Sequence, residues 1–233
     1  MLDALDYVDW SQRSLWIAVA SILFNPLFWN IVARQEYKNK VLTKLAFGKP
    51  YLGCYGLALT IFSLGILRDH LYQIALSNQP THPALHCTEF KLTAAVVFAI
   101  GGVFVVSSMW ALGVTGTYLG DYFGILMDEK VESFPFNVTS NPMYYGSTLS
   151  FLATALWYES PAGLLLTVLV FVEYKIALLF EEPFTGEIYA KRDRERAAAS
   201  GSDKRQPQIE PAAGSSTATA ASTSASRRRG GEL

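Results

Sequence analysis

The chain has 233 residues, of which 51% are hydrophobic and 17% are charged, and its formal net charge at pH 7 is −1. This composition is typical of a multi-pass membrane protein rather than a soluble domain, and the near-zero charge argues against a nucleic-acid-binding protein. Of the two cysteines, Cys54 lies in an apolar run and Cys87 in a polar stretch, which argues against a structural disulfide.

The first apolar run, residues 15–33, contains the pair Asn25-Pro26. Proline removes a backbone hydrogen bond, so the run is either a kinked transmembrane helix or a re-entrant one. Acidic residues precede the run, and it lacks a small-residue cleavage site, so we interpret it as retained rather than as a signal peptide. A basic stretch, residues 34–49, separates it from a second apolar run at 51–67.

A polar loop carrying all three histidines is predicted over residues 68–91. His82 and His86 have the i, i+4 spacing of a helical metal site, but Pro83 interrupts the helix that such a site needs. We therefore predict no metal site here.

The third apolar run covers residues 92–119 and ends in glycines at every fourth position: Gly116, Gly120 and Gly124. These glycines form either a small-xxx-small helix contact or simple packing positions. An acidic loop over residues 121–140 contains the sequon Asn137-Val138-Thr139, which is used only on a lumenal face.

Two apolar segments, residues 142–158 and 161–180, are separated by a turn signal and are predicted to form a helical hairpin. The hairpin brings the stretch from Asn141 to Gly146 to the same side as the adjacent acids Glu181 and Glu182. It also places the basic stretches at 34–49 and 191–196 on one side, as the positive-inside rule requires, so we place the C-terminus in the cytosol.

The predicted fold is therefore an all-α integral membrane bundle with a C-terminal helical hairpin. Residues 1–190 are expected to form the membrane-embedded domain. Residues 191–233 are expected to form a disordered, low-complexity tail. No Gly-x-Gly-x-x-Gly motif follows a strand, and no strand is predicted, which excludes a soluble Rossmann domain.

Six segments of the chain resemble the membrane phospholipid methyltransferases, and most closely the phosphatidylethanolamine N-methyltransferases of vertebrates. They are FNPLFWN (24–30), GTYLGDYFGIL (116–126), FPFN (134–137), NPMYYGST (141–148), GLLLTVL (163–169) and EEPFTGEIY (181–189). The resemblance implies an enzyme of the endoplasmic reticulum membrane that uses S-adenosylmethionine. It implies three successive methylations of phosphatidylethanolamine, through mono- and dimethyl intermediates, to phosphatidylcholine.

The resemblance also implies a cofactor site with contributions from three parts of the chain. The expected cofactor-binding residues are Ala99, Ile100, Gly101, Asn141, Tyr144, Gly146, Glu181 and Glu182. Ala99 stands where the family has the first glycine of a Gly-x-Gly stretch, and Ser140-Asn141 stands where the wider family, including isoprenylcysteine methyltransferases, has Arg-His. In the hairpin topology residues 99–101 are expected far from Glu181, so the hairpin and a shared cofactor site are alternatives.

The chemistry requires acids close to the membrane surface. A cationic methyl donor dissolved in the cytosol needs charge compensation to enter hydrocarbon, which Glu181 and Glu182 supply unless they merely end the helix. The lipid amine must lose a proton before it attacks, and the candidate catalytic bases are Glu182 and Glu187. Glu173, inside the last apolar segment, is a further candidate, or else pairs with Lys175.

A quaternary ammonium product is stabilised by aromatic faces, and the candidate walls are Tyr122, Phe123, Tyr144, Tyr145 and Tyr189. The same tyrosines are equally expected as membrane-interface anchors. Two other functions stay open from the sequence. The chain is alternatively a reductase of similar helical fold that uses NADPH on a sterol-like lipid, or a non-enzymatic membrane scaffold.

Overall fold

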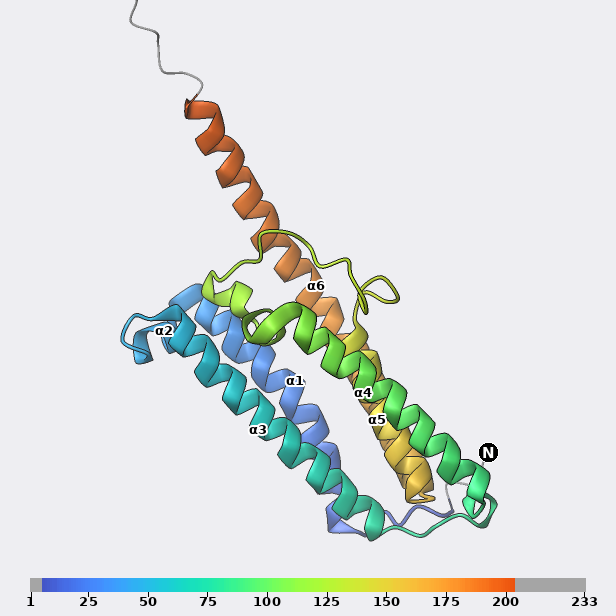
Figure 1. Cartoon of the computed structure of the whole chain (residues 1–233). Helices are drawn as coiled ribbons and strands as arrows, with labels where there is room; N and C mark the ends of the chain where they lie inside the picture. Colours follow the sequence, from blue (N-terminus) through green and yellow to red (C-terminus); the bar gives the residue numbers. More distant parts are fainter. Residues whose placement is uncertain (1–5, 204–233) are drawn as a thin grey trace, which may run out of the picture. The chain divides into compact units, whose positions relative to one another are not determined.

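The computed structural model describes residues 6–203, which contain helices and no β-strand (Figure 1). The α-helices are α1 (Arg13–Asn39), α2 (Val41–Leu45), α3 (Pro50–Ser77), α4 (Thr88–Thr117), α5 (Pro142–Trp157) and α6 (Pro161–Asp203), and the short 3-10 helices are η1 (Pro83–Leu85) and η2 (Gly120–Phe123). The absence of strands in this range confirms the all-α prediction.

Four of the helices in residues 6–203 are long and apolar enough to cross a membrane: Arg13–Asn39, Pro50–Ser77, Thr88–Phe123 and Pro161–Ala199. Their apolar stretches are long enough to cross the hydrocarbon core of a bilayer. Large hydrophobic side chains on their outer faces, such as Trp110 and Leu179, are therefore exposed on the surface of the protein. The fifth predicted segment, α5, is shorter than these four.

Helix α1 runs without interruption through Pro26 and is long and apolar enough to cross a membrane, which favours the transmembrane alternative over the re-entrant one. The side chain of Asn25 is buried and donates to the carbonyl oxygen of Leu64 on α3 at 3.2 Å, which ties the two helices together at this point. At the end of α1 the buried carboxylate of Glu36 accepts from the backbone N–H groups of Leu42 and Thr43, which caps α2.

The predicted polar loop at 68–91 is much shorter in the structure, because α3 continues to Ser77 and α4 begins at Thr88. His70 therefore lies on a helix and not in the loop. Tyr72, Ala75 and Leu76 are buried at i, i+3 and i+4 spacing, and this apolar face holds the end of α3 in the bundle.

The predicted hairpin of α5 and α6 is confirmed. The N–H of Gly163 donates to Ser160 Oγ at the turn, and a Cβ on Gly163 would lie 2.8 Å from the Cβ of Ala155, so the two helices are in close contact. Lys91 Nζ donates to the carbonyl oxygen of Trp157, which places the hairpin turn beside the start of α4. Helix α5 therefore reaches the end of the bundle where α3 is connected to α4.

Helices α4 and α5 pack backbone to backbone through two glycines. A Cβ on Gly101 would lie 2.6 Å from the carbonyl oxygen of Gly146, and one on Gly146 would lie 2.7 Å from that of Gly101. The interpretation of the later glycines as one helix face is wrong. Helix α4 ends at Thr117, Gly120 lies in η2, and Gly124 follows it with a left-handed φ of 84°.

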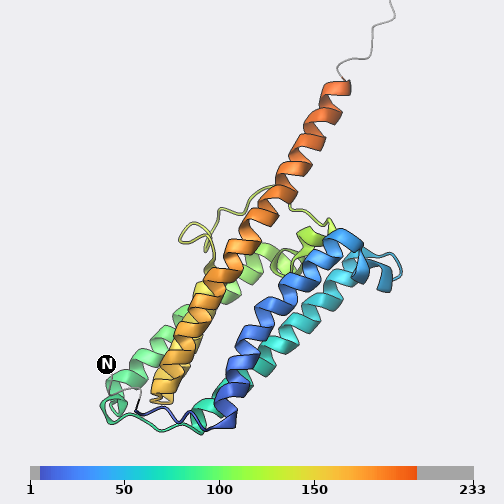
Figure 2. The ribbon, with the colours of Figure 1, turned by 180° about the vertical axis from the view of Figure 1, so that it is seen from behind.

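The main hydrophobic core lies where α1, α3, α5 and α6 meet, and includes Ile22, Leu76, Phe151, Leu166 and Val170. Figure 2 shows these helices from the side opposite to Figure 1. A smaller cluster near the opposite end joins Cys54 and Leu57 of α3 to Phe123. Space remains between the two clusters for the cavity described below.

Helix α6 does not end at the two acids, so the prediction that the helix ends near Phe180 is wrong. The helix continues through Pro183 and Lys191 to Asp203, although the compact unit of the chain ends at Asp193. The rest of the predicted tail, residues 204–233, lies outside the described residues.

Candidate functional site

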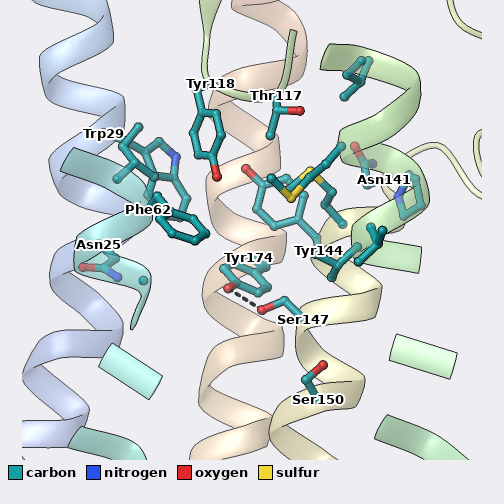
Figure 3. A pocket seen from close by; sticks show the side chains of 18 of the residues that line it. Asn25, Trp29, Phe62, Thr117, Tyr118, Asn141, Tyr144, Ser147, Ser150 and Tyr174 are labelled. Carbon is teal, nitrogen blue, oxygen red and sulfur yellow. Dashed lines mark hydrogen bonds between the residues drawn. The ribbon is translucent and has the colours of Figure 1, made fainter. Parts of the chain in front are cut away.

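A large cavity of about 660 Å³ lies among α1, α3, α4, α5 and α6 (Figure 3). Its volume is within the range of small-molecule and cofactor sites, and its wall is mostly apolar with a few polar groups. We name two groups of these polar residues the acidic end (Asp121, Asn141, Tyr144, Glu181) and the arginine end (Arg68, Asp69, Ser147, Tyr174).

At the acidic end, the carboxylate of Glu181 is held by donors from two other helices. Trp29 Nε1 and Asn30 Nδ2 donate to Oε1 at 2.7 and 2.8 Å, and the hydroxyl of Tyr144 donates to Oε2 at 2.5 Å. The hairpin therefore brings the predicted residues Tyr144 and Glu181 together. Since each carboxylate oxygen accepts about two hydrogen bonds, Oε2 keeps the capacity to accept one more.

Asn141 and Glu182 also meet, as the hairpin predicts. Asn141 lines the cavity, and its Nδ2 donates to Glu182 Oε1 at 2.8 Å. Glu182 itself is exposed and does not line the cavity. Glu182 is therefore connected to the acidic end only through Asn141.

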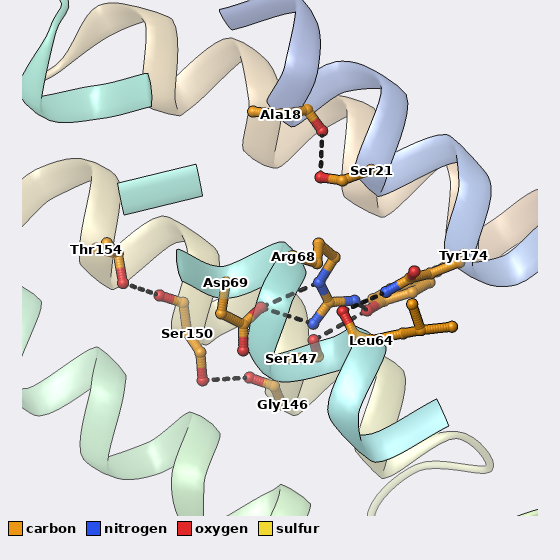
Figure 4. Close-up of polar contacts among 11 residues, drawn as sticks. Ala18, Ser21, Leu64, Arg68, Asp69, Gly146, Ser147, Ser150, Thr154 and Tyr174 are labelled. Carbon is orange, nitrogen blue, oxygen red and sulfur yellow. Dashed lines mark hydrogen bonds and ion pairs between the residues drawn. The ribbon is translucent and has the colours of Figure 1, made fainter. Parts of the chain in front are cut away.

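The arginine end lies about two helical turns from Glu181 along α6 and contains a charged group that the sequence analysis assigned to a loop (Figure 4). Arg68 Nη1 donates to the hydroxyl of Tyr174 at 2.8 Å, and that hydroxyl lies 3.0 Å from Ser147 Oγ. Arg68 Nε and Nη2 both donate to Asp69 Oδ1, at 3.0 and 2.8 Å.

The stretch from Ala99 to Gly101 borders the cavity without lining it. Gly101 is buried against Gly146, while Ala99 and Ile100 are exposed. The next residue, Gly102, does line the cavity, as do Phe98 and Glu181. The hairpin is therefore present while residues 99–101 stay outside the cavity lining, although the cavity extends from Phe98 and Gly102 to Glu181.

The remaining acids differ in position. Glu187 is exposed and does not line the cavity. Glu173 does not pair with Lys175, whose Nζ donates to the hydroxyl of Tyr145 at 2.7 Å. Glu173 Oε2 is buried and has no hydrogen-bond partner among the described residues.

Of the five aromatic residues proposed as walls, only Tyr144 lines the cavity. Tyr122 is buried and stacks on Phe184, and Tyr189 accepts a hydrogen bond from the N–H of Met127. The cavity contains other aromatic side chains instead, and Figure 3 shows Trp29, Phe62, Tyr118 and Tyr174 around it.

Comparison with known proteins identifies the family. The family model described as phospholipid methyltransferase matches residues 90–192. Phosphatidyl-N-methylethanolamine N-methyltransferase of Emericella nidulans is 61% identical over 201 residues, which are 86% of this chain and 98% of the relative. The chain belongs to the phospholipid methyltransferase family.

Two further relatives also align with this chain over most of their length. The Saccharomyces cerevisiae protein of the same name is 54% identical over 80% of this chain and 90% of its own length. Phosphatidylethanolamine N-methyltransferase of Homo sapiens is 49% identical over 88% of this chain and 100% of its own length. No solved structure matches the chain.

Membership of this family makes the chain a membrane methyltransferase, which decides against the reductase and the non-enzymatic scaffold. Several residues of the cavity were missed by the sequence analysis. Trp29 and Asn30 belong to a segment that carried the family resemblance but had no assigned role. Arg68 and Asp69 were missed because the apolar run ends at Leu67, although the buried spacing of the residues that follow continues the helix.

Proposed function

We propose that this protein transfers methyl groups to the amine of ethanolamine phospholipids, converting phosphatidylethanolamine through mono- and dimethyl forms to phosphatidylcholine. The observation that carries the proposal is the cavity, which joins an acidic end to an apolar wall of membrane-length helices. Such a site accepts a cationic, water-soluble donor and a lipid in the same space.

S-adenosylmethionine is the proposed methyl donor, and it supplies an electrophilic methyl group on a sulfonium. The acidic end fits a cation, because Asp121 and Glu181 both line it. Thr117 Oγ1, also at the cavity, is buried without a hydrogen-bond partner among the described residues, which leaves a polar group for a ligand to satisfy. Glu181, Tyr144 and Asn141 are the residues proposed to hold the cofactor, with Glu182 acting through Asn141.

The residues of the cavity contribute to catalysis in two ways: they orient a negative charge and they exclude water from the reacting groups. Trp29, Asn30 and Tyr144 fix the carboxylate of Glu181, so its charge is oriented before any ligand binds. The apolar wall, including Phe62, keeps water from the reacting groups.

The amine of the lipid has an unperturbed pKa of about 10, so a base must remove its proton before each transfer. Both predicted bases are exposed and do not line the cavity, and we favour Glu182 because its carboxylate accepts a hydrogen bond from Asn141, which does line it. The Gly101–Gly146 contact is proposed to act by holding α4 and α5 together at the site rather than by touching the cofactor.

A second candidate substrate follows from the comparisons. Relatives named phosphatidyl-N-methylethanolamine N-methyltransferase are 54–61% identical to this chain, and those named phosphatidylethanolamine N-methyltransferase are 48–52% identical. This difference favours the monomethylated lipid as the preferred acceptor, with phosphatidylethanolamine as a slower one.

The test is methyl transfer by the purified full chain in phospholipid nanodiscs, with labelled S-adenosylmethionine and either phosphatidylethanolamine or its mono- or dimethyl form. The expected result is labelled phosphatidylcholine from all three lipids, fastest from the methylated ones. Absence of transfer to every amine lipid would overturn the proposal, and equal rates would remove the preference for the methylated acceptor.

The proposed location is the endoplasmic reticulum membrane, with the C-terminus in the cytosol. Arg34 and Phe180 are in contact, so the basic end of α1 and the acidic end of the cavity lie on one side of the bundle. Since basic residues favour the cytosolic face, this arrangement supports entry of the cofactor from the cytosol.

A further inference from the structure

Arg68 is a charged residue in the interior of the bundle, on a helix long and apolar enough to cross a membrane. Its side chain is only 11% exposed, and the guanidinium lies over the ring of Phe151 at 4.9 Å. A guanidinium at such a depth is costly, so a residue of this kind is expected to have a functional partner.

The partners of Arg68 within residues 6–203 leave part of the guanidinium without a hydrogen bond. Arginine has five N–H donors, and Arg68 uses three of them, on Tyr174 and on a single oxygen of Asp69. Two donors therefore remain, and Arg68 lines the cavity. Asp69, whose side chain is 53% exposed, is its sequence neighbour and not a residue of an opposing helix, so it does not close the cavity.

We propose that Arg68 binds the phosphate of the phospholipid substrate, an assignment that rests on the proposed function. Among the residues that line the cavity, Arg68 is the one lysine or arginine. The planar fork of its guanidinium matches the oxygens of a phosphate, and a phosphodiester is the one anionic group of an ethanolamine phospholipid. The hydroxyl groups of Ser147 and Tyr174 lie beside it, and since one of them donates to the other, one O–H remains as a further donor.

The opposite orientation of the lipid is disfavoured by charge. At the acidic end a phosphate would face the carboxylates of Asp121 and Glu181, which repel it. With the phosphate at Arg68, the amine points toward the acidic end instead, where negative charge attracts it. The arginine end also holds a carboxylate, Asp69, but among the lining residues it alone offers a guanidinium, so the charge pattern favours this direction of the headgroup.

The spacing along α6 agrees with this orientation. Tyr174, which binds Arg68, and Glu181 are seven residues apart on one helix, a rise of about 10 Å. The ethanolamine arm separates phosphorus from nitrogen by about 5 Å, since it spans four bonds. The nitrogen therefore reaches the space between the two ends of the cavity, while the phosphate stays on Arg68.

The acyl chains have an apolar surface to occupy beside Arg68. Phe62 and Ile66 of α3, and Phe98 and Val106 of α4, line the cavity and are also about half exposed or more. The wall formed by α3 and α4 is therefore accessible from the bilayer, which lets the chains remain in lipid.

The experiment compares Arg68→Gln and Arg68→Lys with Arg13→Gln, an exposed arginine at the first residue of α1. Transfer is measured against lipid concentration at saturating S-adenosylmethionine, for phosphatidylethanolamine and for a long-chain amine that lacks phosphate. We expect Arg68→Gln to raise the KM for the phospholipid by about tenfold or more, with a smaller change in Arg68→Lys. The KM for the phosphate-free amine and the affinity for the cofactor should stay unchanged, as should every value in Arg13→Gln.

Equal losses for both acceptors in Arg68→Gln would show that Arg68 is structural, and an unchanged KM for the phospholipid would likewise overturn the proposal. Lipid binding by native mass spectrometry provides a readout that needs no transfer. The wild-type chain should retain phosphatidylethanolamine over diacylglycerol of the same acyl chains, and Arg68→Gln and Arg68→Lys should lose part of that preference. A wild-type chain that shows the preference but transfers no methyl group would overturn the proposed function alone, and one without the preference would overturn the phosphate site.

Discussion

At the scale of single residues, Glu181 determines the geometry of the acidic end. It belongs to α6, and its partners Trp29 and Asn30 belong to α1, while Tyr144 belongs to α5. A carboxylate held by three donors is fixed in position. This arrangement gives the site a negative charge of defined orientation before a cationic ligand arrives.

Replacing Tyr144 by phenylalanine should weaken cofactor binding. The substitution removes the donor to Glu181 Oε2 but leaves the donors to Oε1, so we expect a loss of about tenfold in affinity for S-adenosylmethionine. Equilibrium dialysis with the labelled cofactor measures it. Tyr145→Phe is the matched control, because that hydroxyl accepts from Lys175 and does not line the large cavity. Equal affinities in the two variants would contradict the role of Tyr144.

The turn between α5 and α6 makes stability depend on pH. The hydrogen bond from Lys91, together with the nearby His86, lowers the pKa of Glu159 below its ordinary value of 4.5. Because the folded state binds the proton less tightly, the stabilisation is present above about pH 4.5 and is lost as the pH falls through the lowered pKa.

Thermal unfolding of Glu159→Gln in detergent, followed by intrinsic fluorescence, checks this expectation. The wild-type chain should melt at a higher temperature than the variant at neutral pH, and the two melting temperatures should converge in acid. Glu129→Gln, at an exposed position in the loop before α5, should match the wild type at every pH. A difference between wild type and Glu159→Gln that stays constant down to acid pH would contradict the assignment.

At the scale of helices, the α4–α5 contact depends on Gly101 and Gly146. Gly101→Ala should destabilise the protein by about 1–3 kcal/mol, because its Cβ would overlap the carbonyl oxygen of Gly146. Gly102→Ala is the control, since its Cβ meets nothing within 4 Å and alanine favours a helix by about 1 kcal/mol. Melting temperatures of the two variants should therefore move in opposite directions, and a tolerated Gly101→Ala would show that the helices separate easily.

The sequence predicted the hairpin well, and for a physical reason. A proline at the first position of α5, a turn signal at Ser160, and an apolar segment on each side of that turn are local features that the folded chain keeps. The ends of helices were predicted less well. Apolar length identifies the part of a helix in lipid, whereas α3 and α6 continue beyond their apolar segments because tertiary contacts and polar helix formers extend them.

The candidate site was predictable only in part, because local sequence patterns do not show which residues tertiary packing brings together. Glu181, Glu182, Asn141 and Tyr144 were found because the hairpin brings two short motifs to one side. Arg68 could not be assigned to the site, since nothing local shows that a residue after an apolar run faces a cavity. Packing among several helices decides this, and only the structure shows it.

At the scale of the whole molecule, the described helices place both hairpin motifs and the basic end of α1 on one side. The other side carries the turn at Glu159 and the short helix η1, whose neighbour His82 donates its N–H to the carbonyl oxygen of Glu159. Lysine and arginine are concentrated on the first side, at 34–49 and 191–196, and the positive-inside rule predicts that this side faces the cytosol. This arrangement predicts which loops a reagent in the cytosol will reach.

Cysteine labelling tests the arrangement in a chain carrying Cys54→Ala and Cys87→Ser. Val138→Cys and Ala190→Cys should react with a membrane-impermeant maleimide added from the cytosolic side, and Ala84→Cys should react only after the membrane is permeabilised. All three positions are exposed, so access and not burial decides the result. Opposite accessibility of residues 138 and 190 would show that α5 does not cross the membrane.

The carboxylate shared by α1, α5 and α6 has an evolutionary consequence. Any single replacement of Trp29, Asn30, Tyr144 or Glu181 removes at least one hydrogen bond of this carboxylate, at a cost of about 1–3 kcal/mol. Natural proteins are only marginally stable, so a chain that carries one of these single replacements loses a large part of its stability. Members of this family should therefore keep these four residues or replace them together. The apolar residues that line the cavity should be substituted more often, to suit other acyl chains.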